Sequence, residues 1–408
     1  MRKHFSVNWI DGMKISKAHF QEMDDFQREQ LALVIQAGLS DYQYGLIGTN
    51  SLGEALDIVV TSERVEVVSC RAITRSGYYI EVNSKNNLYL RRSISDLMGE
   101  RSFAASSGWL IILRLLLEES ISLGVPDPDE HPLRAPYREP KIELEIIPDD
   151  QFTSEGVYAH AIPLARIVND YRGVEKQDGY IPPLMSLSAD RQLLQFYGSW
   201  NEALLEIDGY LYEIIKKVHA KNRSNQGNQL SSDILPLTSG ITKYISENFD
   251  YYRTVLPQRP PVETVLWFMA LARTVKNSMR LATNKDNLLK YFDFYISGEP
   301  TALESSATQV CNHDFSQIDI QQSVAHISHF VGVMKRLFGE LVTLDLHQLL
   351  DPTIIFSTNM SPTANPSFPP PGRSNTGGSI TIKPKSHGSG PSSPTGGNDG
   401  GGGWNISD

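Results

Sequence analysis

The chain has only two cysteines in 408 residues, Cys70 and Cys311, and they are far apart in the sequence. This is too few for a disulfide scaffold, so the composition favours a reducing compartment and two buried thiols. The most apolar stretches, residues 109–117 and 262–275, are interrupted by arginine and are shorter than the ~20 residues that cross a bilayer. The N-terminus also lacks the apolar core of a secretory signal. We therefore expect a cytoplasmic protein without direct membrane insertion.

Positive charge is also scarce. Lysine and arginine number 37 against 47 acidic residues, which gives a formal net charge of -10 at pH 7. Such a balance supplies no general attraction for nucleic-acid phosphates or anionic lipid. Neither glycine-rich phosphate-binding motif, GxGxxG or GxxxxGK(S/T), occurs in the sequence. We expect no nucleic-acid partner and no nucleotide cofactor.

One group of carboxylates is the best place to look for catalysis. Asp127, Asp129 and Glu130 lie together in a proline-spaced stretch, residues 126–140. A glycosidase needs two carboxylates at a set separation across a sugar, whereas these three share one stiff, extended segment. An acidic surface that faces solvent or a partner is favoured over a catalytic pair.

A second group contains residue types that bind metals. Cys311, His313 and Asp314 are close in sequence, and His326 and His329 follow at a spacing of three. No Cys-x-x-Cys or His-Glu-x-x-His motif accompanies them. We expect no metal, no cofactor and no catalytic residue, and therefore a protein that is not an enzyme.

Alternating or short apolar runs predict strands between residues 54 and 168. These runs cover residues 56–60, 64–68, 78–82, 88–90, 109–117, 141–146 and 158–167. No helical pattern separates them, which favours an antiparallel β-sandwich or barrel over a parallel sheet. An amphipathic helix that begins near Ser16 precedes this region, and Phe20, Met23, Leu31 and Val34 fall on one of its sides.

Helical heptad patterns dominate the following region, residues 184–350, and predict a helical bundle. Pro260 and Pro261 begin one further helix, and shorter helices are predicted at 237–252 and 285–296. Two long seams repeat at spacings of three and four. They consist of Leu193, Tyr197, Trp200, Leu204, Ile207, Leu211, Ile214 and Val218, and of Ile320, Val324, Ile327, Val331, Met334, Phe338 and Leu341. Such seams suit an intrachain core and association between subunits equally well.

Residues 351–408 lose this periodicity and become rich in proline, glycine and serine. Such a composition cannot bury a core, so we predict a disordered, low-complexity tail. Two islands interrupt it, one with Ile380 and Ile382 and a terminal one with Trp404. Each is either a short docking peptide or a chance feature of the composition.

The opening of the chain points to a family. It reads VNWIDGM at residues 7–13 and KAHFQ at 17–21, and it resembles the N-terminus of TssK, the trimeric baseplate subunit of bacterial type VI secretion systems. Two weaker features follow in the family's order: YIPPL at 180–184 and the helix that begins with PPVE at 260–263 and closes with YFD at 291–293. The resemblance covers most of residues 7–350.

The resemblance implies a division into an N-terminal arm (1–15), a β-rich shell domain with its leading helix (16–183), a helical-bundle neck (184–350) and the tail (351–408). The chain would form a homotrimer that connects the baseplate wedge, made of TssF- and TssG-like proteins, to the membrane-anchoring complex. It would lie at the inner face of the cytoplasmic membrane. The heptad residues would pack within and between the subunits of the neck.

For the arm, the resemblance implies two roles that stay open. Trp9, Met13, His19 and Phe20 either contact the wedge or tie the arm to the shell domain.

One feature departs from the family. TssK proteins have a folded head domain after the neck, which docks on the membrane complex, whereas only 58 mostly low-complexity residues follow Leu350. We expect the head to be absent and the membrane link to be made differently, either by the tail islands or by another anchoring partner.

Two other functions are compatible with the sequence. A phage-like receptor-binding or tail adaptor protein is the nearest alternative. A carbohydrate-active enzyme that uses the carboxylates of residues 127–130 is the rival from a different class.

Overall fold

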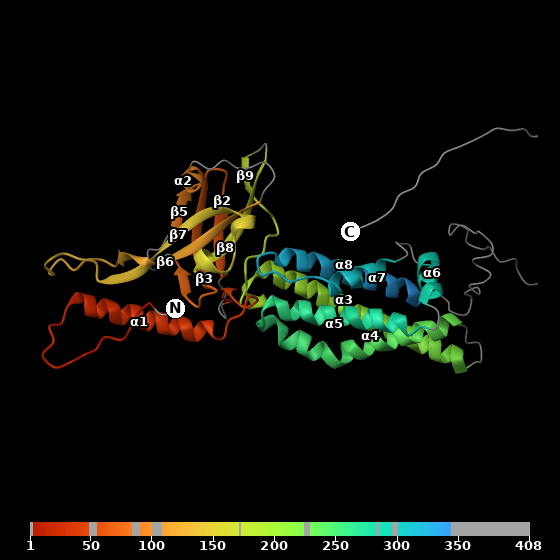
Figure 1. Cartoon of the computed structure of the whole chain (residues 1–408). Coiled ribbons are helices and arrows are strands. Elements are labelled where there is room, and N and C mark those ends of the chain that lie inside the picture. Colours follow the sequence, from red (N-terminus) through yellow and green to blue (C-terminus); the bar gives the residue numbers. More distant parts are fainter. Residues whose placement is uncertain are drawn as a thin grey trace, which may run out of the picture. The chain divides into compact units, whose positions relative to one another are not determined.

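The computed structural model describes residues 3–48, 55–83, 90–99, 108–170, 173–223, 229–282, 285–295 and 301–343. Helices and two antiparallel sheets together confirm an α+β protein (Figure 1). The predicted tail at 351–408, with Ile380, Ile382 and Trp404, lies outside the described residues, and so does the end of the predicted neck at 344–350. The predicted division into domains stays a prediction.

Helix α1 (Lys17–Gln36) begins where the sequence predicts, with Ser16 as its N-cap. The Ser16 backbone N–H donates to His19 Nδ1 over 3.2 Å, which satisfies a backbone donor at the helix start. The face that this helix buries is not the apolar one: Glu29 and Ala32 are its buried residues. Leu31 and Val34, on the predicted apolar side, are exposed.

The first sheet has five strands: β1 (Gly45–Leu46), β2 (Leu56–Val60), β3 (Arg64–Ile73), β4 (Tyr79–Val82) and β5 (Leu90–Ser93). Strand β3 pairs antiparallel with each of the other four. Alternate β3 side chains, such as Val65 and Val67, are fully buried, which is the period-two pattern of a strand with one face against a core.

The second sheet has the order β7-β6-β8-β9. Its strands are β6 (Trp109–Leu123), β7 (Tyr137–Pro148), β8 (Ala161–Asp170) and β9 (Gly173–Lys176), and the short helix α2 (Ile94–Met98) precedes it. Residues 109–113 of β6 are all buried because both faces of the sheet are covered. One face shares the main core with the first sheet, and the other packs around Phe152 and Tyr180.

The proline-spaced segment is shorter than predicted. Strand β7 already begins at Tyr137 and includes Pro140, which is buried in the β6–β7 pair. The excursion is limited to residues 124–136, which are exposed over most of their length and contain no helix.

The helical part contains α3 (Arg191–Arg223), α4 (Gln229–Thr254), α5 (Pro261–Arg280), α6 (Lys285–Tyr295), α7 (Ala302–Cys311) and α8 (Ile320–Thr343). Helix α3 packs between α4 and α8, and α5 packs against α4 and α7. The sequence did not predict α7, whose small side chains (Ser306 and Ala307 among them) give a weak apolar pattern. Single 3-10 turns occur at Asp149–Gln151, Gly156–Tyr158, Leu187–Ala189 and Leu256–Gln258.

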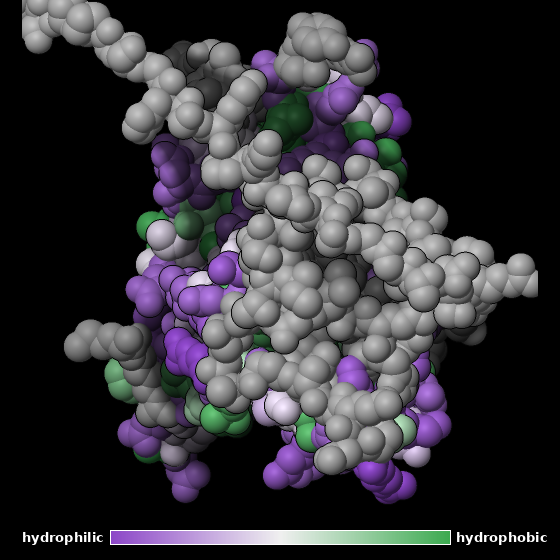
Figure 2. Space-filling view, turned by 90° about the vertical axis from the view of Figure 1, so that its right-hand side faces the viewer, coloured by the Kyte–Doolittle hydropathy of each residue, from purple (hydrophilic) through white to green (hydrophobic). Residues whose placement is uncertain are grey.

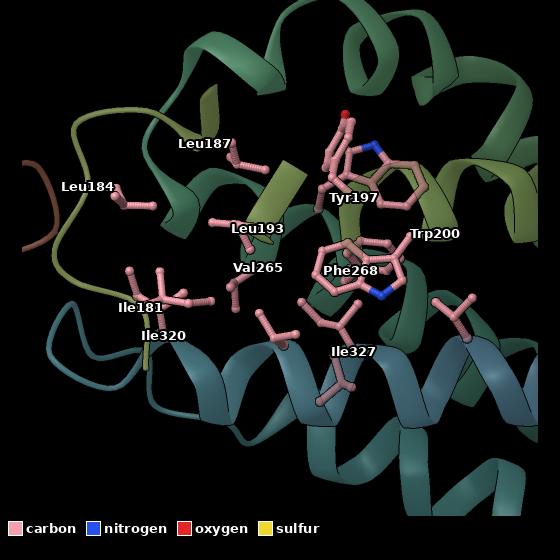
Figure 3. Packing of buried hydrophobic residues seen from close by; sticks show 14 of the residues in the cluster. Ile181, Leu184, Leu187, Leu193, Tyr197, Trp200, Val265, Phe268, Ile320 and Ile327 are labelled. Carbon is pink, nitrogen blue, oxygen red and sulfur yellow. The ribbon is translucent and has the colours of Figure 1, made fainter. Parts of the chain in front are cut away.

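All residues of the two long seams are buried in the bundle core. The apolar seam of α5, which consists of Val265, Phe268, Ala272, Val275 and Met279, is buried there too. Aromatic rings meet at the centre, where the Tyr197 and Tyr252 centroids are 4.5 Å apart. Trp200 lies edge-on to Phe268 with the ring centroids 5.4 Å apart, and Figure 3 shows these two side chains together. The Trp200 indole N–H also donates to Ser328 Oγ over 3.0 Å. In the single chain these side chains pack against one another. The role of the seams between subunits stays a prediction.

The YIPPL segment joins the last strand to α3 and is fastened to β1. Leu46 and Leu184 form an isolated parallel bridge, and the Leu46 N–H donates to the Pro183 carbonyl over 2.7 Å. Gly45 has a φ of +120°, and a Cβ there would lie 2.0 Å from the same carbonyl oxygen. Only glycine fits this close approach.

Two adjacent leucines of α3 test the packing of the bundle. Leu204 is completely buried, whereas Leu205 is 53% exposed. We expect Leu204→Ala to lower the free energy of unfolding by roughly 2–5 kcal/mol through lost contacts and a cavity. Leu205→Ala should lower it by less than about 1 kcal/mol. Urea unfolding followed by helical circular dichroism measures both, and equal losses would contradict the assigned core.

Candidate protein-binding surface

The N-terminal arm is held on α1 by two carboxylates. Glu29 accepts hydrogen bonds from the Lys3 and His4 backbone N–H groups at 2.8 and 2.9 Å, and Glu22 accepts one from the Phe5 N–H at 3.1 Å. Glu22 and Glu29 are seven residues apart and therefore lie on the same face of the helix. We call this arrangement the carboxylate clamp.

The clamp explains why an acidic residue is buried on α1. Removing a carboxylate from water is costly unless its oxygens receive hydrogen bonds, and two backbone amides provide them for Glu29. The His4 ring adds a contact, with Nδ1 3.3 Å from Glu22 Oε1. Burial, and then the Glu29 charge, raise the pKa of the nearby Tyr78 hydroxyl.

Beyond the clamp, three rings of the TssK-like opening lie close together. We call this opening, residues 7–13 and 17–21, the family-like box. The Trp9 ring lies 6.0 Å from that of His19 and 6.1 Å from that of Phe20, measured between centroids. The structure thus brings together three of the four predicted arm residues. Met13, the fourth, is partly buried and closes a turn through its N–H to the Ile10 carbonyl at 3.3 Å.

These apolar side chains remain accessible. Trp9 is 45% and Phe20 49% exposed, and Phe5, Ile10 and Ile15 are exposed as well. We call these five residues the arm tip. Large apolar side chains are normally buried, and a group of exposed ones marks an interaction site. Figure 2 shows another face, on which the described residues that remain visible are largely hydrophilic, with scattered hydrophobic ones.

The acidic group of the proline-spaced loop lies on one surface segment. Asp127 and Asp129 are exposed, and the Asp129 N–H donates to Asp127 Oδ1 over 2.9 Å. Glu130 forms an ion pair with Arg134 at 2.7 Å. All three carboxylates lie in the same loop, as the sequence predicts.

The group with metal-binding residue types is packed differently. His313 Nε2 lies 2.6 Å from Ser323 Oγ, and its ring meets that of His326 edge-on at 4.8 Å. Burial, followed by the neighbouring His326, lowers the pKa of His313. Within the described ranges, no three His, Cys, Asp or Glu side chains are grouped to hold a metal.

The two thiols differ in their surroundings. Cys70 is fully buried, and burial raises the pKa of its thiol to about 12. Cys311 is only half-buried, so the prediction of two buried thiols is wrong for this residue. Helix α7 ends at Cys311, which leaves its side chain at the edge of the bundle core.

No family model matches the chain, and no curated protein matches it in sequence. Solved structures match in three dimensions. A TssK-TssF-TssG baseplate subcomplex of the type VI secretion system contains a chain with 16% identity and a TM-score of 0.43; the match covers 83% of this chain and all of the other.

Two further TssK-related structures match at a similar level. A crystal structure of TssK has 12% identity and a TM-score of 0.41 over 66% of this chain and 60% of the other. A type VI baseplate complex has 15% identity and a TM-score of 0.44 over 83% of this chain and all of the other. Structures of TssK and of type VI baseplate complexes thus match the chain, as the resemblance in sequence predicts.

Among the residues that the structure describes, none forms a helix both long and apolar enough to cross a bilayer.

Removing one carboxylate tests the clamp. We expect Glu29→Ala to release the Lys3 and His4 amides, so that their hydrogen exchange accelerates by at least about tenfold, the equivalent of roughly 1.4 kcal/mol. Asp24→Ala, at an exposed position of the same helix, is the matched control and should leave exchange unchanged. Equal protection in both variants would show that the clamp does not hold the arm.

Proposed function

We propose that the chain is a structural component of a type VI secretion baseplate and that its arm tip binds the wedge proteins. The arm tip is the observation on which this proposal rests. Trp9, His19 and Phe20, which belong to the TssK-like part of the sequence, lie together, and Trp9 and Phe20 are about half exposed in the single chain. Aromatic residues of this kind dominate the binding energy of many interfaces.

The two roles left open for the arm can be weighed by its contacts. The clamp already ties the arm to α1 through backbone amides of residues 3–5, and it uses no side chain of the family-like box. Trp9 and Phe20 contact each other while about half of each ring is accessible. Because backbone amides hold the arm and the aromatic side chains stay accessible, wedge contact is the favoured role for these side chains.

The finer description is also part of the proposal. The chain is a homotrimeric connector between the wedge and the membrane-anchoring complex, with the two sheets as its shell and the helices as its neck. It acts in the cytoplasm, at the inner face of the cytoplasmic membrane, and it catalyses no reaction. The order of the sequence features supports this: VNWIDGM precedes α1, KAHFQ begins it, YIPPL precedes α3 and PPVE lies at the start of α5. A membrane link through the tail is retained as a prediction.

Truncating the arm tip tests the proposal. We expect Trp9→Ala and Phe20→Ala together to weaken co-purification with TssF- and TssG-like wedge proteins by at least about 30-fold. This corresponds to a loss of roughly 2 kcal/mol, as expected for aromatic hot-spot residues. Thermal unfolding should change little because neither side chain lies in the core.

Tyr212→Ala is the matched control, since Tyr212 is an equally exposed aromatic residue on α3. It should leave wedge binding unchanged. Undiminished binding by the Trp9/Phe20 double variant would remove the arm tip from the interface.

A further inference from the structure

A second apolar surface lies at the other end of α1. A groove of about 620 Å³ runs between α1, β4 and the β6–β7 pair. Its apolar walls include Leu31 and Ile35 from the helix and Tyr79, Leu115, Tyr137 and Ile142 from the sheets. None of the arm-tip residues lines it, so the groove is a separate surface.

The helix wall of the groove is fixed by a close contact. Gly77 precedes β4 with a φ of +86°, and a Cβ at this position would lie 2.1 Å from the Ala32 carbonyl oxygen. The absent side chain lets α1 approach the sheet at this point. The neighbouring Leu31 side chain is nevertheless 66% exposed, and Tyr79 and Tyr137 on the opposite walls are exposed too. The groove is therefore open and lined by unburied apolar groups.

The charged groups around the groove differ in their pairing, and Glu81 accepts a hydrogen bond from the Asn83 side chain at 2.9 Å. Arg28 on the helix wall is paired with Asp25 at 2.9 Å, and Arg138 is paired with the same carboxylate at 2.8 Å. The sheet side contributes two carboxylates, Glu81 and Glu139. Glu139 is exposed and has no counter-ion among the residues that the structure describes. A carboxylate beside an apolar groove is complementary to a basic side chain that flanks apolar ones.

We propose that this groove binds a segment of a partner protein in which apolar side chains are flanked by lysine or arginine. The apolar side chains cover Leu31, Tyr79 and Tyr137, and the basic group pairs with Glu139. The volume lies within the range of sites that enclose several side chains. This proposal is independent of the baseplate role, because it concerns a different surface and its test needs no wedge protein.

The test uses the full chain and two synthetic peptides of equal length, one composed of leucine and lysine and the other of leucine and glutamate. Fluorescence anisotropy at 0.15 M salt measures the binding of each labelled peptide. We expect the lysine peptide to bind at least about tenfold more tightly than the glutamate peptide. Leu31→Asp and Glu139→Lys should each weaken the lysine peptide by at least about tenfold.

Two substitutions of the same kind elsewhere serve as controls. Leu281→Asp changes an exposed leucine at the end of α5, and Glu202→Lys reverses an exposed charge on α3. Both should leave binding unchanged, which separates the groove from the overall negative charge of the protein. Leu31→Ala provides a milder variant if the aspartate lowers stability.

Three results would overturn the proposal. The lysine peptide could fail to bind, it could bind no better than the glutamate peptide, or it could bind the groove variants as tightly as the control variants. A second copy of the chain is the competing occupant. If Leu31→Asp converts a wild-type oligomer to monomers in analytical ultracentrifugation, that second copy fills the groove and the proposed partner does not.

Discussion

The side-chain amide of Gln317 holds together three segments that are distant in the sequence. Its Nε2 atom lies 3.1, 3.2 and 2.9 Å from the carbonyl oxygens of Tyr42, Tyr44 and Leu184. The residue is almost fully buried, where a carbonyl without a donor costs roughly 1–3 kcal/mol. This amide joins the loop before α8 to the chain before β1 and to the YIPPL segment, which the Leu46–Pro183 hydrogen bond already holds together.

The contacts that hold the sheets and helices together are internal, and the exposed side of α1 remains available for other contacts. The heptad seams are buried inside the bundle, and residues 109–113 of β6 are covered on both faces of the second sheet. Large exposed apolar residues gather instead on the arm, on α1 and on the strands beside it. A protein that only had to fold would bury them. Their concentration on and around α1 favours a binding role for both ends of this helix. The arm tip lies at its first end and the groove at its second.

Local sequence patterns predicted much of the fold. The Ser16 cap, the start of β2 at Leu56 and the start of β6 at Trp109 all lie where alternation and capping placed them. The heptad residues are buried as a bundle core requires. Each of these features depends on neighbours within one or two turns or along one strand, which is the information that periodicity contains.

Features that depend on distant partners were not predicted. The sequence indicated an apolar face for α1 at Leu31 and Val34, but the helix buries Glu29 because the amides of the arm return to it. The groove requires Gly77, α1 and β7 to meet, and no spacing rule connects them. Two acids seven residues apart on α1 were the available signal for the clamp, although exposed acids on helices show the same spacing.

The proposed role depends most directly on assembly. Native mass spectrometry of the full chain, alone and after co-expression with TssF- and TssG-like wedge proteins, measures it in one experiment. The account predicts three copies of the 45.6 kDa chain and a further species that contains the wedge proteins. A monomer that binds no wedge protein at any concentration would contradict it.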